Sequence, residues 1–250
     1  MYKAIRSPKA SHALPTMYDL PSEEIGDPGL PDQYHLWQAE LLSQTFCPPN
    51  YNSEEILVAG DLNLYYDVNN TNWYKRPDWF GVVGIDRFYK KVDSRLSYVI
   101  WDEKVTPLII AEFLSPGTDK DDLGLKKAKP GKPPTKWQVY EQILKIPYYV
   151  VFNRYENKIY FFELVNGKYR EIALTNSKFW LPEIELGLGL WLGSYQGLNR
   201  LWLRWYDKQE NWIPTPVETE KQRAEAEKQR ADILAARLRE LGINPDDLTS

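Results

Sequence analysis

The chain has 250 residues and a net charge of −4, with 43% hydrophobic and 26% charged residues. This composition predicts a globular protein with one substantial domain and appendages. No apolar run approaches the roughly 18 residues of a membrane span, and the N-terminus lacks the apolar core of a signal peptide. The acidic balance argues against constitutive coating of nucleic acid. It does not exclude a nuclease, because a carboxylate site attracts phosphate only after it binds its metal.

Cysteine and histidine are scarce. The single cysteine, Cys47, excludes an internal disulfide and a cysteine-rich zinc site. Only His12 and His35 are available, so a histidine-based metal site is not expected. We therefore expect a cytoplasmic protein whose metal, if it has one, is held by oxygen ligands.

Aromatic residues make up 14% of the chain, and ten of them are tryptophans. Such enrichment is typical of a base-stacking groove or, more commonly, of a tightly packed core. The alternating Arg200, Trp202 and Arg204 raise the same choice, and we expect them to pack a terminal hairpin rather than stack on bases.

The first part of the chain predicts an arm followed by a helix. Residues 1–31 contain five prolines and little periodicity, so we expect an extended arm. From Pro31 to Phe46, apolar residues recur at three- and four-residue spacing, which predicts a helix with Asp32 as its N-cap. Glu40 lies within this helix, and the prolines after Cys47 end it.

The middle of the chain predicts a series of strands. Branched and aromatic residues gather there in short runs bounded by turn-forming residues. The runs on either side of residues 154–157 predict a hairpin. The expected strands are Ile56–Asp67, Pro77–Ile85, Leu96–Trp101, Leu108–Leu114, Pro147–Asn153, Lys158–Leu164 and Tyr169–Leu174, with further strands across Leu186–Tyr206.

A loop and a helix separate the fourth and fifth of these strands. Residues 115–135 are rich in proline, glycine and lysine, which predicts a long loop. Its lysines suit either a phosphate-binding track or a solvated loop balanced by nearby aspartates, and we favour the solvated loop. Residues Lys136–Leu144 predict a helix with Thr135 as its N-cap.

The C-terminal part contains two consecutive seven-residue repeats, Glu220–Ala226 and Glu227–Ile233. This period predicts a helix that Gly242 and Pro245 end. The apolar stripe is short and rich in alanine, so a helix that packs on the domain is at least as well supported as the interface of a homodimer. We expect four parts: an arm over 1–31, a domain over 32–214, a heptad helix over 215–242 and a tail over 243–250.

Two acidic residues define the candidate site. Asp78 follows a proline at the start of an expected strand, and Glu112 lies inside the apolar run Thr106–Leu114. The neighbours of Glu112 predict burial on both faces, where a carboxylate is costly unless it is paired or binds a cation. Asp78 alone fits an ordinary turn aspartate, and Glu112 fits an ion-pair partner of Arg76 or Lys136. Together, the two carboxylates favour a site for Mg²⁺ or Mn²⁺.

Six short segments, in their order and spacing, resemble a known family. They are Ala59–Tyr66, Arg76–Asp78, Ile110–Thr118, Asp122–Gly124, Lys136–Tyr140 and Ile146–Tyr149. In these segments the chain resembles the Uma-two family of restriction-endonuclease-like proteins, within the PD-(D/E)xK nuclease superfamily. The resemblance covers most of residues 30–240. It implies an α/β restriction-endonuclease fold, in which a mixed central sheet is flanked by helices and the Asp and Glu lie on neighbouring strands.

The chain departs from the superfamily pattern at the lysine. The pattern places a lysine two residues after the Glu on the same strand face, and here that position is Leu114. The resemblance implies that a lysine on the next helix replaces it, and Lys136 fits best. Lys126 is the competitor, because it follows the Asp122–Gly124 segment at a short spacing.

Three further residues are secondary candidates. Asp61 lies in an expected strand and is either an additional metal ligand or an outward-facing residue. Glu40 resembles a helix carboxylate found near the metal in some superfamily members, although a solvated helix face is the favoured interpretation. Tyr140 lies one helical turn after Lys136, so it either faces the same cleft or is a core tyrosine with a bonded hydroxyl.

These patterns lead to two hypotheses of different classes. The first is a Mg²⁺-dependent DNA endonuclease in which Asp78 and Glu112 bind metal and Lys136 stabilises the developing charge or positions the attacking water. The second is a catalytically silent protein of the same fold that binds DNA or assembles through its C-terminal helix. Metal-dependent thermal stabilisation distinguishes the two, because only an intact carboxylate site responds to the ion.

Overall fold

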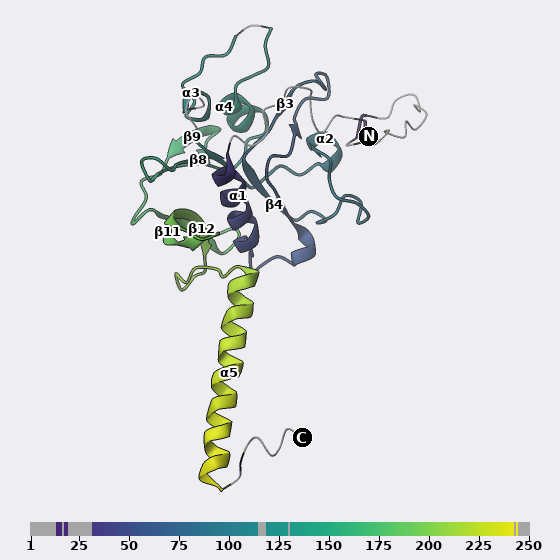
Figure 1. Cartoon of the computed structure of the whole chain (residues 1–250). Coiled ribbons are helices and arrows are strands. Elements are labelled where there is room, and N and C mark those ends of the chain that lie inside the picture. The colour runs from purple at the N-terminus through teal and green to yellow at the C-terminus, as the bar shows by residue number, and fades with distance from the viewer. Residues whose placement is uncertain are drawn as a thin grey trace. The chain divides into compact units, whose positions relative to one another are not determined.

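The computed structural model describes residues 14–16, 18–19, 32–114, 119–129, 131–242 and 244. The chain divides into two compact units, Met1–Ile213 and Pro214–Ser250. Figure 1 shows the helices and strands of both units. Most of the expected N-terminal arm and, apart from Asn244, the expected tail over 243–250 lie outside the described residues.

The predicted first helix is confirmed as α1, Gln33–Thr45. The Asp32 side chain caps it by accepting hydrogen bonds from the backbone amides of Tyr34 and His35. Leu41 and Leu42 are fully buried, so this helix presents an apolar face to the sheet. A short 3-10 helix, η1, follows at Ser53–Glu55.

A six-stranded mixed sheet forms the centre of the first unit, in the order β1-β4-β6-β7-β8-β9 (Figure 1). Strands β6 and β7 run parallel, and the other neighbours in this sheet run antiparallel. The β7–β8 pair is the predicted hairpin. The strands are β1 Ile56–Ala59, β4 Trp79–Val83, β6 Ile109–Phe113, β7 Tyr148–Asn153, β8 Lys158–Val165 and β9 Lys168–Glu171.

Two smaller sheets complete the unit. One has the order β3-β2-β5 and the other the order β10-β11-β12. Strand β10 was not predicted from the sequence. Their strands are β2 Leu64–Tyr65, β3 Tyr74–Lys75, β5 Tyr98–Val99, β10 Lys178–Leu181, β11 Leu186–Tyr195 and β12 Leu198–Tyr206.

The expectation of one continuous strand over Ile56–Asp67 is wrong. Strand β1 ends at Ala59, and Asp61 adopts a left-handed backbone conformation with φ of 53°. Because a left-handed residue breaks the pleat, the chain leaves the central sheet there and joins the small sheet as β2. The strand expected over Leu96–Trp101 is also shorter than predicted, since β5 passes directly into helix α2, Ile100–Glu103.

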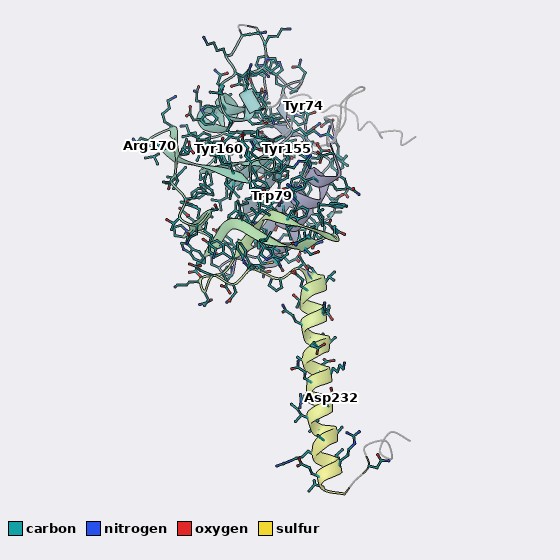
Figure 2. The ribbon with its side chains drawn as sticks, turned by 60° about the vertical axis from the view of Figure 1, so that its left-hand side comes forward. Tyr74, Trp79, Tyr155, Tyr160, Arg170 and Asp232 are labelled. Carbon is teal, nitrogen blue, oxygen red and sulfur yellow. The ribbon has the colours of Figure 1, made fainter. Side chains whose placement is uncertain are left out.

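The two faces of the central sheet belong to two apolar clusters. On one face, α1 and strands β10–β12 pack against side chains such as Trp79, which is fully buried. Trp79 is labelled in Figure 2. On the other face, the helical segment before β7 packs against Phe80 and Ile110. This arrangement confirms the predicted mixed α/β fold with a central sheet flanked by helices.

The connection from β6 to β7 differs in part from the expected loop and helix. A short helix, α3, occupies Asp119–Asp122 within the expected loop. The expected helix begins as α4, Lys136–Gln138, with the predicted cap at Thr135, and continues as a π-helix, η2, over Val139–Ile143. Gly124, between these helices, has a φ of 71°, and a Cβ at this position would lie 2.6 Å from the Trp137 ring.

The arginines of β12 pack as predicted. Trp202 is fully buried, Arg200 lies 4.5 Å from the centre of the Tyr34 ring, and Arg204 lies 4.2 Å from the centre of the Trp191 ring. Arg204 also donates to the carbonyl of Ile213 through Nε and Nη2. Trp202 and Arg204 therefore belong to the core, and the partly buried Arg200 packs on Tyr34.

The second unit consists of helix α5, Pro216–Glu240. Thr215 and Glu218 form a capping box at its start. Ion pairs join Arg223 to Glu227 within the repeats, and the helix ends before Gly242, as expected. None of the helices in the described part of the chain is long and apolar enough to cross a membrane.

Candidate active site

Asp78 and Glu112 lie opposite each other where strands β4 and β6 pair. The pairing of Trp79 with Ala111 places Asp78, one residue before β4, against Glu112 on β6. Directly opposite residues of an antiparallel pair point to the same face. Both carboxylates therefore lie on the face of the sheet that the α4–η2 segment covers.

Hydrogen bonds cross between the two acidic residues. The backbone amide of Asp78 donates to Oε2 of Glu112 at 3.3 Å, and the amide of Phe113 donates to Oδ2 of Asp78 at 2.6 Å. Glu112 is completely buried. The backbone thus holds both carboxylates in a fixed relation, which a preorganised metal site requires.

Lys136, and not Lys126, reaches this pair. Its ammonium Nζ lies 3.0 Å from Oε2 of Glu112. The first residue of α4 is held in place by the Thr135 cap, which aims the lysine at the sheet. Lys126 instead pairs with Asp121 at 2.7 Å, and its side chain is 57% exposed. Of the two candidate lysines, Lys136 is therefore the one that contacts Glu112.

A third carboxylate, Asp122, was not predicted as part of the site. It is 2% exposed, and its Oδ1 lies 2.7 Å from Nζ of Lys136. The hydroxyl of Tyr149 donates to its backbone carbonyl at 2.9 Å and ties α3 to β7. We call Asp78, Glu112 and Asp122 the acid cluster. The only sequence signal for Asp122 was its place in the Asp122–Gly124 segment.

Tyr140 is the second helical residue at the site. Its side chain is fully buried, and its hydroxyl donates to Oε1 of Glu112 at 3.0 Å. The residue belongs to the π-helix, whose extra residue per turn changes the direction of the side chains that follow. Both sequence interpretations of Tyr140 therefore hold, since it is a core tyrosine and its hydroxyl faces the acid cluster.

Electrostatics make the acid cluster receptive to a cation. Burial raises the pKa of Glu112 to about 8; Lys136 opposes this rise, whereas Asp78 and Asp122 add to it. Burial also raises the pKa of Asp78, against the effects of Lys136 and the Phe113 amide. Burial alone would lower the pKa of Lys136, but the carboxylates outweigh it and hold that pKa above its ordinary range. One ammonium thus contacts the buried Glu112 and Asp122, and the partly buried Asp78 lies opposite Glu112.

The other candidates are engaged elsewhere. Asp61, which does not lie in a strand, forms an ion pair of 2.8 Å with Arg76. Arg76 is therefore an ion-pair partner of Asp61, and Lys136 is the ion-pair partner of Glu112. Glu40 accepts hydrogen bonds from Gln44 and Gln196 at 3.0 and 3.4 Å. These contacts support the interpretation of Glu40 as a residue of the outer helix face and give Asp61 a structural partner.

A contact between α1 and β6 behind the site was also not predicted from the sequence. His35 on α1 is fully buried, and its Nε2 lies 2.8 Å from the carbonyl oxygen of Phe113, next to Glu112. Its Nδ1 lies 2.9 Å from Oδ1 of Asp32, which also pairs with Arg154. This chain of contacts fixes the end of β6 from the opposite face.

The oxygen atoms of the site suit a hard divalent cation. Oδ1 of Asp78 accepts no hydrogen bond from the described residues, whereas Oδ2 is bound. Within the described ranges, no group of three or more histidine, cysteine, aspartate or glutamate side chains is arranged to hold a metal ion. The arrangement therefore offers two carboxylates, and Mg²⁺ commonly binds through one or two carboxylates while keeping several waters.

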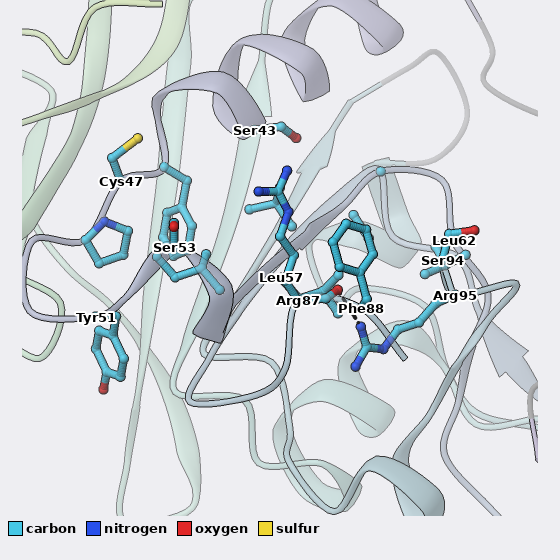
Figure 3. Close-up of a pocket in the computed structure, with 16 residues that line it drawn as sticks. Ser43, Cys47, Tyr51, Ser53, Leu57, Leu62, Arg87, Phe88, Ser94 and Arg95 are labelled. Carbon is cyan, nitrogen blue, oxygen red and sulfur yellow. Dashed lines mark hydrogen bonds between the residues drawn. The ribbon is translucent and has the colours of Figure 1, made fainter. Parts of the chain in front are cut away.

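A separate cavity lies elsewhere in the first unit. It has a volume of about 560 Å³ and is lined by the end of α1, by β1 and by the loop that carries Arg87 and Phe88. Figure 3 shows Cys47 and Tyr51 on one side and Phe88 on the other. Asp78, Glu112 and Lys136 do not line it, so the acid cluster is a better candidate for chemistry than this cavity.

Comparison with known proteins finds a family match over the part of the chain that contains the acid cluster. The family model Uma2, described as "Putative restriction endonuclease", matches residues 9–194. The chain belongs to the Uma2 family. This match spans every residue of the acid cluster together with Lys136 and Tyr140. No curated protein matches the chain.

Proposed function

We propose that this Uma2 protein is a metal-dependent endonuclease that hydrolyses phosphodiester bonds of DNA at the acid cluster. The observation that carries the proposal is the ion pair of 3.0 Å between Lys136 and the buried Glu112, beside Asp78. A nuclease needs carboxylates to hold a cation and a positive group beside them to meet the phosphate. Membership of a family described as restriction endonucleases supports DNA as the substrate.

Each side chain has a distinct role in this proposal. Asp78, through Oδ1, which accepts no hydrogen bond from the described residues, and Glu112 would hold Mg²⁺ or Mn²⁺. The bound ion would activate a water and neutralise charge on the phosphodiester. Lys136 stabilises negative charge as it develops on the phosphate oxygens or orients the attacking water. Its ammonium remains protonated for this task, because the surrounding carboxylates keep its pKa high.

Two neighbours position these groups. Tyr140 donates to Oε1 of Glu112 and fixes the orientation of that carboxylate. Asp122 holds Lys136 at 2.7 Å, so the ammonium stays at the edge of the site and its side chain remains 21% exposed. In this proposal neither neighbour takes part in bond breaking.

Cleavage of supercoiled plasmid tests the proposal. We expect the purified protein to nick or linearise plasmid DNA in Mg²⁺ or Mn²⁺, and we expect Asp78→Asn to be inactive although it retains the wild-type circular-dichroism spectrum. Lys126→Met is the matched control, since it removes an exposed lysine that pairs with Asp121 and does not contact Glu112. Equal cleavage by the wild type and Asp78→Asn would refute the proposed site.

A further inference from the structure

Lys75 is a cation close in sequence to Asp78 that makes no ion pair with another residue of the described ranges. It lies on β3, three residues before Asp78, and its side chain is partly buried. The charged groups that act on it are, from the strongest to the weakest, Asp121, Lys136, Lys126 and Glu112. Lys75 thus belongs to the same charged surroundings as the candidate active site, although sequence analysis gave no reason to select it.

The carboxylates near Lys75 are already engaged. Asp121 pairs with Lys126 at 2.7 Å, and Asp122 pairs with Lys136 at 2.7 Å. Glu112 accepts from Lys136 and from Tyr140. Across the described ranges of the chain, the Lys75 ammonium makes no ion pair and no hydrogen bond.

The position of Lys75 is fixed by its strand. Lys75 pairs in register with Leu64 on β2, and β2 in turn pairs with β5. The next residue, Arg76, donates from Nε to the carbonyl of Asp61 at 3.1 Å. The strand pairing therefore holds the backbone at Lys75, three residues before Asp78.

A partly buried cation without a partner is costly, because it loses hydration and gains no compensating contact. Burial accordingly lowers the pKa of Lys75, and the neighbouring Lys136 and Lys126 add to this effect while Asp121 opposes it. An anion arriving from outside the protein would relieve the cost. In a site for nucleic acid, that anion is a backbone phosphate.

We propose that Lys75 binds a phosphate of the DNA backbone beside the scissile phosphodiester, as a second substrate contact distinct from Lys136. The inference rests on the nuclease function proposed above. It assigns Lys75 to substrate binding: Lys136 faces the reacting phosphate, and Lys75 secures the neighbouring stretch of the strand.

The salt dependence of DNA binding tests this assignment. We would measure binding of a fluorescent short duplex of random sequence in Ca²⁺, which carries the same charge as Mg²⁺ and also takes oxygen ligands. Removing one phosphate contact should weaken binding at every salt concentration and reduce the slope of log K against log salt by about 1. We therefore expect this reduced slope for Lys75→Met and a near-wild-type slope for Lys75→Arg, which keeps the charge.

Lys208 provides the control, because it is an exposed lysine in the turn after β12. Lys208→Met should leave both affinity and slope unchanged. A Lys75→Met variant that binds like the wild type at all salt concentrations would overturn the inference, as would a wild-type protein that does not bind the duplex. Thermal unfolding of each variant checks that a loss of binding is not a loss of fold.

Failure of this inference can be told apart from failure of the nuclease proposal. If the wild type cleaves plasmid but Lys75→Met keeps the full salt slope, the role of Lys75 is wrong and the nuclease stands. If the slope falls as expected but the wild type cleaves nothing in either metal, Lys75 binds phosphate in a protein that is not a nuclease under these conditions.

Discussion

Buried charge occurs on both faces of the central sheet, and it is compensated in opposite ways. Arg204, at 3% exposure, lies over the Trp191 ring and donates twice to the carbonyl of Ile213. In the acid cluster, Glu112 and Asp122 share the ammonium of Lys136, and Asp78 makes no ion pair with another described residue. The arginine is satisfied by groups of the protein itself, whereas the acid cluster keeps a surplus of negative charge.

This difference separates structural charge from functional charge. A satisfied cation contributes to folding and has no capacity left for a ligand. A surplus of buried carboxylates raises the pKa of its members and costs stability until a cation arrives. Substitutions on the Arg204 side should therefore affect stability, and substitutions in the acid cluster should affect metal binding and cleavage.

The largest effect is expected for Glu112→Gln. Loss of the buried carboxylate should lower the cleavage rate by about 1,000-fold or more, since it removes a metal ligand and the partner of Lys136. The metal-free variant should be at least as stable as the wild type, because burial of the Glu112 carboxyl costs free energy either as charge or as proton uptake, and the amide carries neither cost. Plasmid cleavage and thermal unfolding without metal measure the two results. A variant that is strongly destabilised and still cleaves would contradict the comparison.

Arg204→Met should show the opposite pattern. We expect a loss of about 3 kcal/mol in the free energy of unfolding, because the cation–aromatic contact and two charged hydrogen bonds disappear. Cleavage per folded molecule should stay at the wild-type level. Urea denaturation and plasmid cleavage at low temperature check these results. Unchanged stability would remove the distinction between the two charged regions.

Lys136→Met should reduce the cleavage rate by about 100-fold, the scale associated with loss of one group that stabilises transition-state charge. Lys126→Met should change the rate little, since its ammonium pairs with Asp121 at the exposed edge. Steady-state cleavage of a plasmid under both substitutions measures the contrast. Equal losses at the two lysines would assign the rate effect to general positive charge.

Metal binding should strengthen as pH rises. Because burial raises the pKa of Glu112 to about 8, its carboxyl holds a proton at lower pH, and metal must displace that proton. Stabilisation of the protein by Mn²⁺ should therefore increase by about 2 kcal/mol between roughly pH 6.5 and 8. Thermal unfolding at a fixed Mn²⁺ concentration reports this change. A stabilisation that is constant over this range would show that Glu112 does not couple metal to protons.

The smallest effect is expected for Tyr140→Phe. The substitution removes the hydrogen bond to Oε1 of Glu112 and keeps the ring in the core. Loss of such a bond costs about 1 kcal/mol, so cleavage should fall about fivefold. A kinetic comparison with Tyr149→Phe, which removes a hydroxyl bound to the Asp122 carbonyl, tests whether the effect is specific to Glu112. A loss of cleavage rate as large as that of Lys136→Met would instead indicate that Tyr140 takes part in the reaction itself.

The sequence was sufficient for the elements defined by local pattern. The apolar neighbours of Glu112 predicted the burial that β6 displays, and the runs around residues 154–157 predicted the β7–β8 hairpin. Thr135 was recognisable as a cap because capping depends on residues three positions apart. These features are set by contacts near in sequence, where periodicity carries the information.

The features that could not be predicted from the sequence depend on contacts between residues that are distant along the chain. The choice between Lys136 and Lys126, and the membership of Asp122, follow from how α3 and α4 fold over the sheet, which loop composition does not specify. The break at Asp61 depends on a left-handed residue that no periodicity indicates. Lys75 became conspicuous only when the partners of its charged neighbours were known.

Direct measurement of Mn²⁺ binding tests the central claim most simply. Titration of the protein with Mn²⁺, followed by electron paramagnetic resonance of the free ion, should reveal saturable binding in the wild type and in Arg204→Met. The same titration should reveal no such binding in Asp78→Asn or Glu112→Gln. This pattern would identify the surplus charge of the acid cluster as the metal site. Equal Mn²⁺ binding by the wild type and both acid-cluster variants would contradict the account, since the ion would then be held by other residues.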